Sequence, residues 1–271
     1  MEKVGGQLVK KNFVPSECSL QIKDSVCSGK TLDKVAAAIG VEPKLEKVKE
    51  VLGVEAESEI YKHPDVIKKI GSAQAQAVLQ NNFNPPGPYN NNSWLSNVHL
   101  DSKQEQYAKH STELFNKKYT YCPFQMIDFA DVGGELTQID IVDVAKKYDC
   151  FGVIFNTDYS SGRGIHWFCS YIDFTSNPIA IEYFNSSGGP PKPQVADWMH
   201  KVKTQLLLAN REAQIIIVPK RQLQYSNSEC GVWSLMYLQS RLEGKPPSYF
   251  EDNSALDSDM LTFRSNLFRW S

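Results

Sequence analysis

The chain has 271 residues, of which 41% are hydrophobic and 22% are charged, proportions typical of a globular protein with a packed core. Its 29 lysines and arginines nearly balance 31 aspartates and glutamates, so no field of one sign favours nucleic acid or an anionic membrane as a partner. No stretch approaches the roughly 18 apolar residues of a membrane span, and the first residues lack the apolar core of a signal peptide. We therefore expect a cytosolic protein.

The first third of the chain is predicted to be helical. The segment Thr31 to Leu79 is rich in Ala, Glu, Lys, Val and Leu, with apolar residues at helical spacing. The glycines expected to end helices or form turns are Gly40, Gly53 and Gly71. A run of Asn, Pro and Gly from Asn84 to Ser93 then breaks regular structure. We place a domain boundary there, with a helical domain at residues 1–83 and a second domain at residues 84–271.

Strands and helices are interleaved in the second domain. Four runs of strand type are predicted at residues 151–158, 166–174, 179–185 and 213–218. A helix from Asp197 to Ala209 carries its large apolar residues on one face. A second helix, Cys230 to Leu242, is apolar around most of its circumference and should be buried.

The six cysteines are scattered, without the close pairs of a disulfide scaffold or a Cys-x-x-Cys zinc site. We expect most of them to be reduced and buried, and no metal or organic cofactor is implied. In a reducing compartment a single cysteine can serve as a nucleophile. The six are Cys18, Cys27, Cys122, Cys150, Cys169 and Cys230.

Cys230 has the surroundings expected of a nucleophile, because a polar loop runs directly into an apolar helix that begins there. Backbone N–H groups and the helix dipole at this position should lower the thiol pKa. Gly231 would leave room for a substrate backbone, and Gln224 could donate a hydrogen bond to an oxyanion. Cys230 could instead be a buried structural cysteine, and Gln224 a solvated loop glutamine.

His166 is the candidate general base, since among five histidines only this one opens a strongly apolar strand, with glycines at 162 and 164 before it. On its own it could equally be a core histidine. A histidine base is held by a third side chain. Asp173 is excluded because it lies about 23 Å further along the same strand and faces the other side.

The geometry of a hairpin selects the third side chain. If residues 175–178 form the turn, pairing runs back from Phe174 and Ile179, so that residues 185–187 lie opposite His166. Asn185 is then the best partner for the imidazole, with Ser186 and Ser187 as lesser candidates if the register slips. Glu182 would sit about five residues down the ladder, as a surface or supporting charge.

Together, His166-Trp, Phe184-Asn185-Ser and a Gln224 six residues before Cys230-Gly resemble the SUMO-specific protease family. The viral branch of this family is the closer match. The likeness includes Phe155-Asn-Thr-Asp158 and covers most of residues 84–271. In the first domain, Pro15 to Cys18 resembles the N-terminal arm of that branch. The resemblance implies an α+β, papain-like cysteine protease fold of the SUMO-protease type with an N-terminal helical arm domain. The implied catalytic residues are His166, Asn185, Gln224 and Cys230, and the implied substrate-binding residues are Trp94, Asn156, Trp167 and Gly231.

The resemblance also implies a function. A viral endopeptidase of this type would cleave structural polyproteins after Gly-Gly, as a late protein of the host cytoplasm that is packaged in virions. Trp94 and Trp167 would form a narrow channel over the two glycines and exclude side chains. Removal of SUMO or ubiquitin-like modifiers from host proteins is an alternative. A third is a module that binds Gly-Gly tails without cutting them, which has no need for a nucleophile.

Overall fold

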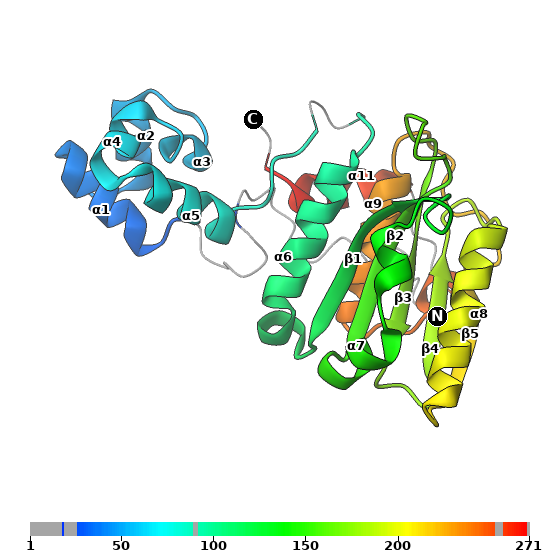
Figure 1. Ribbon diagram of the computed structural model, residues 1–271. Coiled ribbons are helices and arrows are strands. Elements are labelled where there is room, and N and C mark those ends of the chain that lie inside the picture. Colours follow the sequence, from blue (N-terminus) through cyan, green and yellow to red (C-terminus); the bar gives the residue numbers. More distant parts are fainter. Residues whose placement is uncertain (1–17, 19–25, 89–91, 253–256, 270–271) are drawn as a thin grey trace, which may run out of the picture. The chain divides into compact units, whose positions relative to one another are not determined.

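The computed structural model describes residues 18, 26–88, 92–252 and 257–269 (Figure 1). These residues form two compact units, of which one is Asn92–Phe263. Residues 84–88 and the chain end from Arg264 belong to the other unit, with the helices. The backbone N–H of Arg269 donates to Pro85 O at 3.0 Å, and Gly87 N–H donates to Arg269 O at 2.9 Å. The boundary at residues 83/84 stays a prediction; residues 89–91 and Pro15 to Glu17 lie outside the described part.

The helical unit consists of five short helices around a core of its own. They are α1 (Lys30–Ile39), α2 (Leu45–Leu52), α3 (Glu57–Ile60), α4 (Pro64–Ile70) and α5 (Ser72–Asn82). Gly40 and Gly53 end α1 and α2 in the left-handed conformation, with φ of 76° and 66°, a conformation that is strained for residues with a side chain. The predicted helical character and the glycine stops of this region are therefore confirmed.

Cys18 and Cys27 form a disulfide within the helical unit, a single bond that their spacing did not indicate. The fold brings both side chains into one buried core, which linear spacing does not reveal. The other four cysteines are free and buried, as expected.

The larger unit is built on a five-stranded sheet in the order β1-β2-β3-β4-β5 (Figure 1). The strands are β1 (Tyr119–Met126), β2 (Cys150–Asn156), β3 (Trp167–Asp173), β4 (Ile179–Phe184) and β5 (Ala213–Val218). The β3–β4 hairpin is antiparallel, with Cys169 opposite Phe184 and Asp173 opposite Ala180. This is the predicted register, and it carries residues 185–187 to the end of the sheet where His166 precedes β3.

Helices cover both faces of the sheet (Figure 1). On one face lie α6 (Asn97–Phe115) and α9 (Cys230–Leu242), where the Cys169 thiol of β3 lies 3.7 Å from Ser234 O of α9. The opposite face packs a core of Phe155, Phe168 and Tyr183 against α7 (Ile141–Lys147) and α8 (Pro193–Leu208). The remaining short elements are η2 (Glu135–Gln138), α10 (Tyr249–Asp252) and α11 (Asp257–Leu267). In the described part of the chain, no helix is long and apolar enough to cross a membrane.

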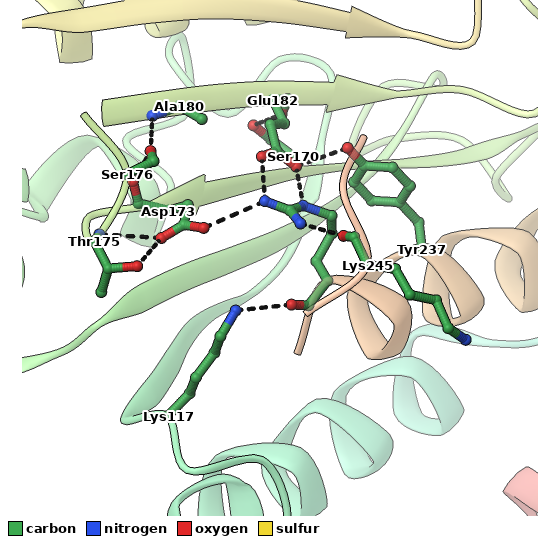
Figure 2. Close-up of polar contacts among 10 residues, drawn as sticks. Lys117, Ser170, Asp173, Thr175, Ser176, Ala180, Glu182, Tyr237 and Lys245 are labelled. Atoms are coloured by element: carbon green, nitrogen blue, oxygen red, sulfur yellow. Dashed lines mark hydrogen bonds and ion pairs between the residues drawn. The ribbon is translucent and has the colours of Figure 1, made fainter. Parts of the chain in front are cut away.

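A buried ion pair connects α9 to the β3–β4 hairpin (Figure 2). Arg241, near the end of α9, donates to both carboxylate oxygens of Glu182, at 2.8 and 2.9 Å. It also contacts Asp173 at 3.3 Å and lies over the ring of Tyr171. The hydroxyl of Tyr237 donates to Glu182 at 2.7 Å. Two carboxylates from two strands therefore converge on one guanidinium from the helix.

Of the two expectations for Glu182, a surface charge or a supporting charge, the first is wrong. Its side chain is fully buried, although the register that placed it away from His166 is right. Burial raises the pKa of this carboxyl, while the Arg241 guanidinium and the Tyr237 hydroxyl lower it. Sequence periodicity located the residue along the strand, but only α9 supplies the cation that permits its burial.

We expect Glu182→Gln to destabilise the larger unit. Removing one partner of a buried pair leaves the other charge uncompensated, which typically costs about 3 to 5 kcal/mol of unfolding free energy. The remaining contact of Arg241 with Asp173 should place the loss near the lower end. Urea denaturation would measure it, with Lys146→Gln, which breaks an exposed pair with Asp143, as a control with little effect. Equal midpoints for the two variants would contradict the anchoring role.

Candidate active site

His166 and Asn185 meet at one end of the β3–β4 hairpin. His166 lies just before β3 and Asn185 just after β4, and the imidazole Nε2 is 2.8 Å from Asn185 Oδ1. Pairing along the hairpin produces this meeting without any special loop. Asp173 lies at the other end of β3, opposite Ala180, so its exclusion agrees with the structure.

The contacts of Asn185 determine which nitrogen of His166 carries the proton. The amide Nδ2 donates to the Tyr183 hydroxyl at 3.1 Å and to Gly189 O at 3.4 Å. The N–H and hydroxyl of Ser187 both donate to Oδ1, so the oxygen must face the imidazole. Because Oδ1 can only accept, Nε2 carries the hydrogen, and Nδ1 of the neutral ring is the basic nitrogen.

Cys230 is the first residue of α9, and its thiol is almost fully buried. The backbone N–H groups of Trp167, Gly231 and Cys230 itself point at the sulfur and lower its pKa. The Trp167 N–H belongs to the peptide that joins it to His166, so the sulfur lies against the segment that carries the base.

The expected lowered pKa of the thiol is corrected. Burial raises the pKa of Cys230 by more than the three N–H groups lower it, and the Glu229 carboxylate raises it further. Burial also lowers the pKa of His166. Both shifts favour the neutral thiol and the neutral imidazole at rest.

Gln224 lies on the loop that precedes α9 and is also buried. Its Oε1 accepts from the Ser186 hydroxyl at 2.7 Å, and its Nε2 donates to Ser226 O at 2.8 Å. Asp257 holds the next part of the loop, since its carboxylate accepts from the N–H groups of Tyr225 and Ser226, each at 2.7 Å. One amide hydrogen of Gln224 is left for a further acceptor.

Trp94 and Trp167 line one cleft of about 400 Å³. Trp167 is buried, donates from Nε1 to Leu95 O at 2.9 Å, and meets the Phe124 ring edge-on. Trp94 is 52% exposed. One wall of the cleft is thus fixed by packing, whereas the other stands in solvent.

Of the other two predicted substrate-binding residues, Asn156 and Gly231, only the first lines this cleft. Asn156 lines the cleft, where its Oδ1 accepts from the N–H groups of Asp158 and Ile165 and so fixes both ends of the loop before His166. A side chain at Gly231 would meet Leu95 and Leu100 at 3.2 to 3.3 Å, and the contact of this glycine with a substrate backbone stays a prediction. The small size of the glycine serves the packing of α9 against these two side chains.

Sequence reasoning missed several residues around the site. Leu95 and Phe124 hold Trp167, and Asp257 holds the Gln224 loop. No signal in the sequence links Asp257 to this loop, because the contact spans about 30 residues. Within the residues described, no group of three or more His, Cys, Asp or Glu could hold a metal ion.

Comparison with known proteins agrees with this arrangement. The model of the Ulp1 protease family, C-terminal catalytic domain, matches residues 102–269. The chain therefore belongs to the Ulp1 protease family and is a cysteine protease. It is similar to cysteine protease S273R of African swine fever virus (strain Badajoz 1971 Vero-adapted), with 36% identity over 280 residues that cover 97% of this chain and 98% of the relative.

The fold is confirmed by a solved relative. The crystal structure of the African swine fever virus pS273R protease matches with a TM-score of 0.80 and 30% identity, over 97% of this chain and 98% of that one. The putative thiol protease R355 of Acanthamoeba polyphaga mimivirus is 22% identical over 206 residues, which cover 71% of this chain and 62% of that protein. The resemblance to the family and the α+β protease fold with an N-terminal helical region are thus confirmed.

The pH dependence should report the state of His166. Its pKa is lowered by burial, and the hydrogen bond to Asn185 raises it in part. Activity that needs the neutral base is therefore present above the imidazole pKa and lost as the pH falls through it, below the usual 6.5. In Asn185→Ala this acid limb should move to lower pH, while kcat falls by roughly 100-fold.

Rates on a Gly-Gly-Xaa peptide, measured as kcat and as kcat/KM across the pH range, would give both the position of the acid limb and the fall in kcat. Asn185→Asp is the matched variant, because an added carboxylate raises the imidazole pKa and should move the limb to higher pH. Equal limbs in the three proteins would show that Asn185 does not act on this base.

Proposed function

We propose that this protease is an endopeptidase that cleaves viral structural polyproteins after Gly-Gly, as a late protein of the host cytoplasm that enters virions. The observation that carries the choice of Gly-Gly is the cleft between Trp94 and Trp167. Trp167 follows the base directly, and its backbone N–H reaches the Cys230 sulfur. A cleft with indole walls accepts an extended backbone and disfavours side chains next to the nucleophile.

The chemistry proceeds through an acyl-enzyme. His166 Nδ1 takes the proton from Cys230 as the sulfur attacks the carbonyl carbon before the scissile bond. Gln224 and the Cys230 backbone N–H donate to the oxyanion. The imidazolium then gives its proton to the leaving amine, and a water activated by Nδ1 releases the carboxylate product. Burial raises the pKa of the Cys230 thiol and lowers that of His166, and both shifts disfavour an ion pair before attack.

Removal of ubiquitin-like modifiers is the second candidate. A relative from African swine fever virus (isolate Tick/South Africa/Pretoriuskop Pr4/1996), 36% identical to this chain, bears the name SUMO-1 cysteine protease S273R. Incubation of the purified protein with SUMO conjugates and with a viral structural polyprotein that contains Gly-Gly-Xaa sites would separate the two functions. Faster release of SUMO than of polyprotein fragments would favour the second.

Cys230→Ala should abolish cleavage of the polyprotein and leave the fold intact, because only the sulfur at the start of α9 is removed. Cys169 is the matched control, since it is equally buried but packs within β3 against Ser234 O. Cys169→Ala should lower the melting temperature and keep cleavage. The assignment of the nucleophile fails if two well-folded variants lose turnover equally, as judged by peptide cleavage and circular dichroism.

Trp94→Ala should relax the choice of glycine. The side chain is half exposed, so its removal costs little stability, whereas Trp167 is packed and would be a poor test. Cleavage of Gly-Gly-Xaa peptides should weaken, and the relative rate on Ala-Gly and Gly-Ala peptides should rise. Alkylation of Cys230 by a small reagent should stay unchanged.

The control is Tyr159→Ala, which removes an aromatic side chain of similar exposure, 55%, from outside this cleft. Relative rates on the three peptides that matched the wild type in Trp94→Ala would eliminate the channel. Equal changes in both variants would mean that general surface effects dominate.

A further inference from the structure

The turn after β4 contains two neighbouring serines whose hydroxyl groups have different targets. Ser186, 1% exposed, donates to Gln224 Oε1 at 2.7 Å. Ser187 donates to Asn185 Oδ1 at 2.8 Å. The mechanism above uses neither serine, yet each contacts one of the polar side chains on which it depends.

Ser186 and Ser226 together fix the orientation of the Gln224 amide. Ser226 O can only accept, so it requires the nitrogen end of the amide on its side. The Ser186 hydroxyl then holds the oxygen end. A reversed amide would set two carbonyl oxygens against each other. The orientation that remains keeps the second N–H of Nε2 available as an oxyanion donor.

The backbone reinforces this contact. The N–H groups of Leu223 and Gln224 both donate to Ser186 O, at 2.8 and 2.9 Å. Gly188 has a φ of +73°, and a side chain there would approach Arg221 C to 2.5 Å. Only glycine allows the turn to lie so close to the Gln224 loop.

We propose that Ser186 is a positioning residue for Gln224, and Ser187 a positioning residue for Asn185. This inference rests on the proposed roles of Gln224 as oxyanion donor and Asn185 as partner of His166. One turn thereby sets the geometry of two steps. Ser186 acts on the stabilisation of the oxyanion, and Ser187 acts on the orientation of the base.

Double-mutant cycles separate the two positioning roles. Ser186→Ala should lower kcat on a Gly-Gly-Xaa peptide by about 10-fold with little change in KM, since the Gln224 amide would lose the buried hydrogen bond that holds its oxygen end. In the Gln224→Ala background the same change should have no further effect. Combined with Asn185→Ala, its factor should multiply with that of Asn185→Ala.

Ser187→Ala should show the opposite pattern: no further effect after Asn185→Ala, and independent effects with Gln224→Ala. Alkylation of Cys230 by iodoacetamide should be slower in Ser187→Ala, because the base is less well held, and unchanged in Ser186→Ala. Ser186→Thr keeps the hydroxyl and should recover most of kcat. Melting temperatures of all variants distinguish these effects from loss of the fold.

The inference is overturned if Ser186→Ala leaves kcat unchanged, or lowers it by the same factor with and without Gln224. Either result would make the contact purely structural. The proposed function fails separately: a wild-type protein without turnover, or full activity in Cys230→Ala, would remove it whatever the cycles show. Unchanged kcat in Gln224→Ala would end the oxyanion role and the Ser186 proposal together, but would leave the nucleophile in place.

Discussion

The site depends on the buried ion pair between Arg241 and Glu182. Cys230 begins α9 and Arg241 lies in its last turn, so a contact at one end sets where the other end lies. Apolar packing around α9 is non-directional and would tolerate a small slide along the helix axis. Two hydrogen bonds to Glu182 in a fixed fork geometry do not. The ion pair therefore fixes the sulfur relative to the hairpin that carries His166 and Asn185.

The polar turn that directly follows β4 imposes the same kind of constraint. Asn185 has partners on both sides of its amide, and Gln224 is held by Ser186 and Ser226. Amide side chains can present either end to a neighbour, so their use in a site requires partners that distinguish oxygen from nitrogen. Burial makes those partners obligatory, because an unmatched polar atom costs about 1 to 3 kcal/mol there.

Sequence alone predicted the hairpin well and its surroundings poorly. The register followed from where the turn falls between Phe174 and Ile179, because antiparallel pairing then determines every opposing residue. Strand β1 was missed: Pro123 interrupts its pattern, and the pairing with β2 shifts register between Cys122 and Gln125. Contacts made by distant segments were invisible, as with the Cys18–Cys27 bond, the burial of Glu182 by Arg241, and Asp257 at the Gln224 loop.

The pKa shifts follow from the same burial that orders the site. An exposed thiol at a helix start would ionise more readily, but it would leave Gln224 and the Cys230 N–H in water, where their hydrogen bonds to an oxyanion are weak. Enclosing the sulfur raises the thiol pKa and, in the proposed mechanism, strengthens the donors that act as charge develops on the substrate. In the proposed mechanism, Nδ1 of His166, whose ring is oriented by Asn185, takes the proton from the thiol during attack.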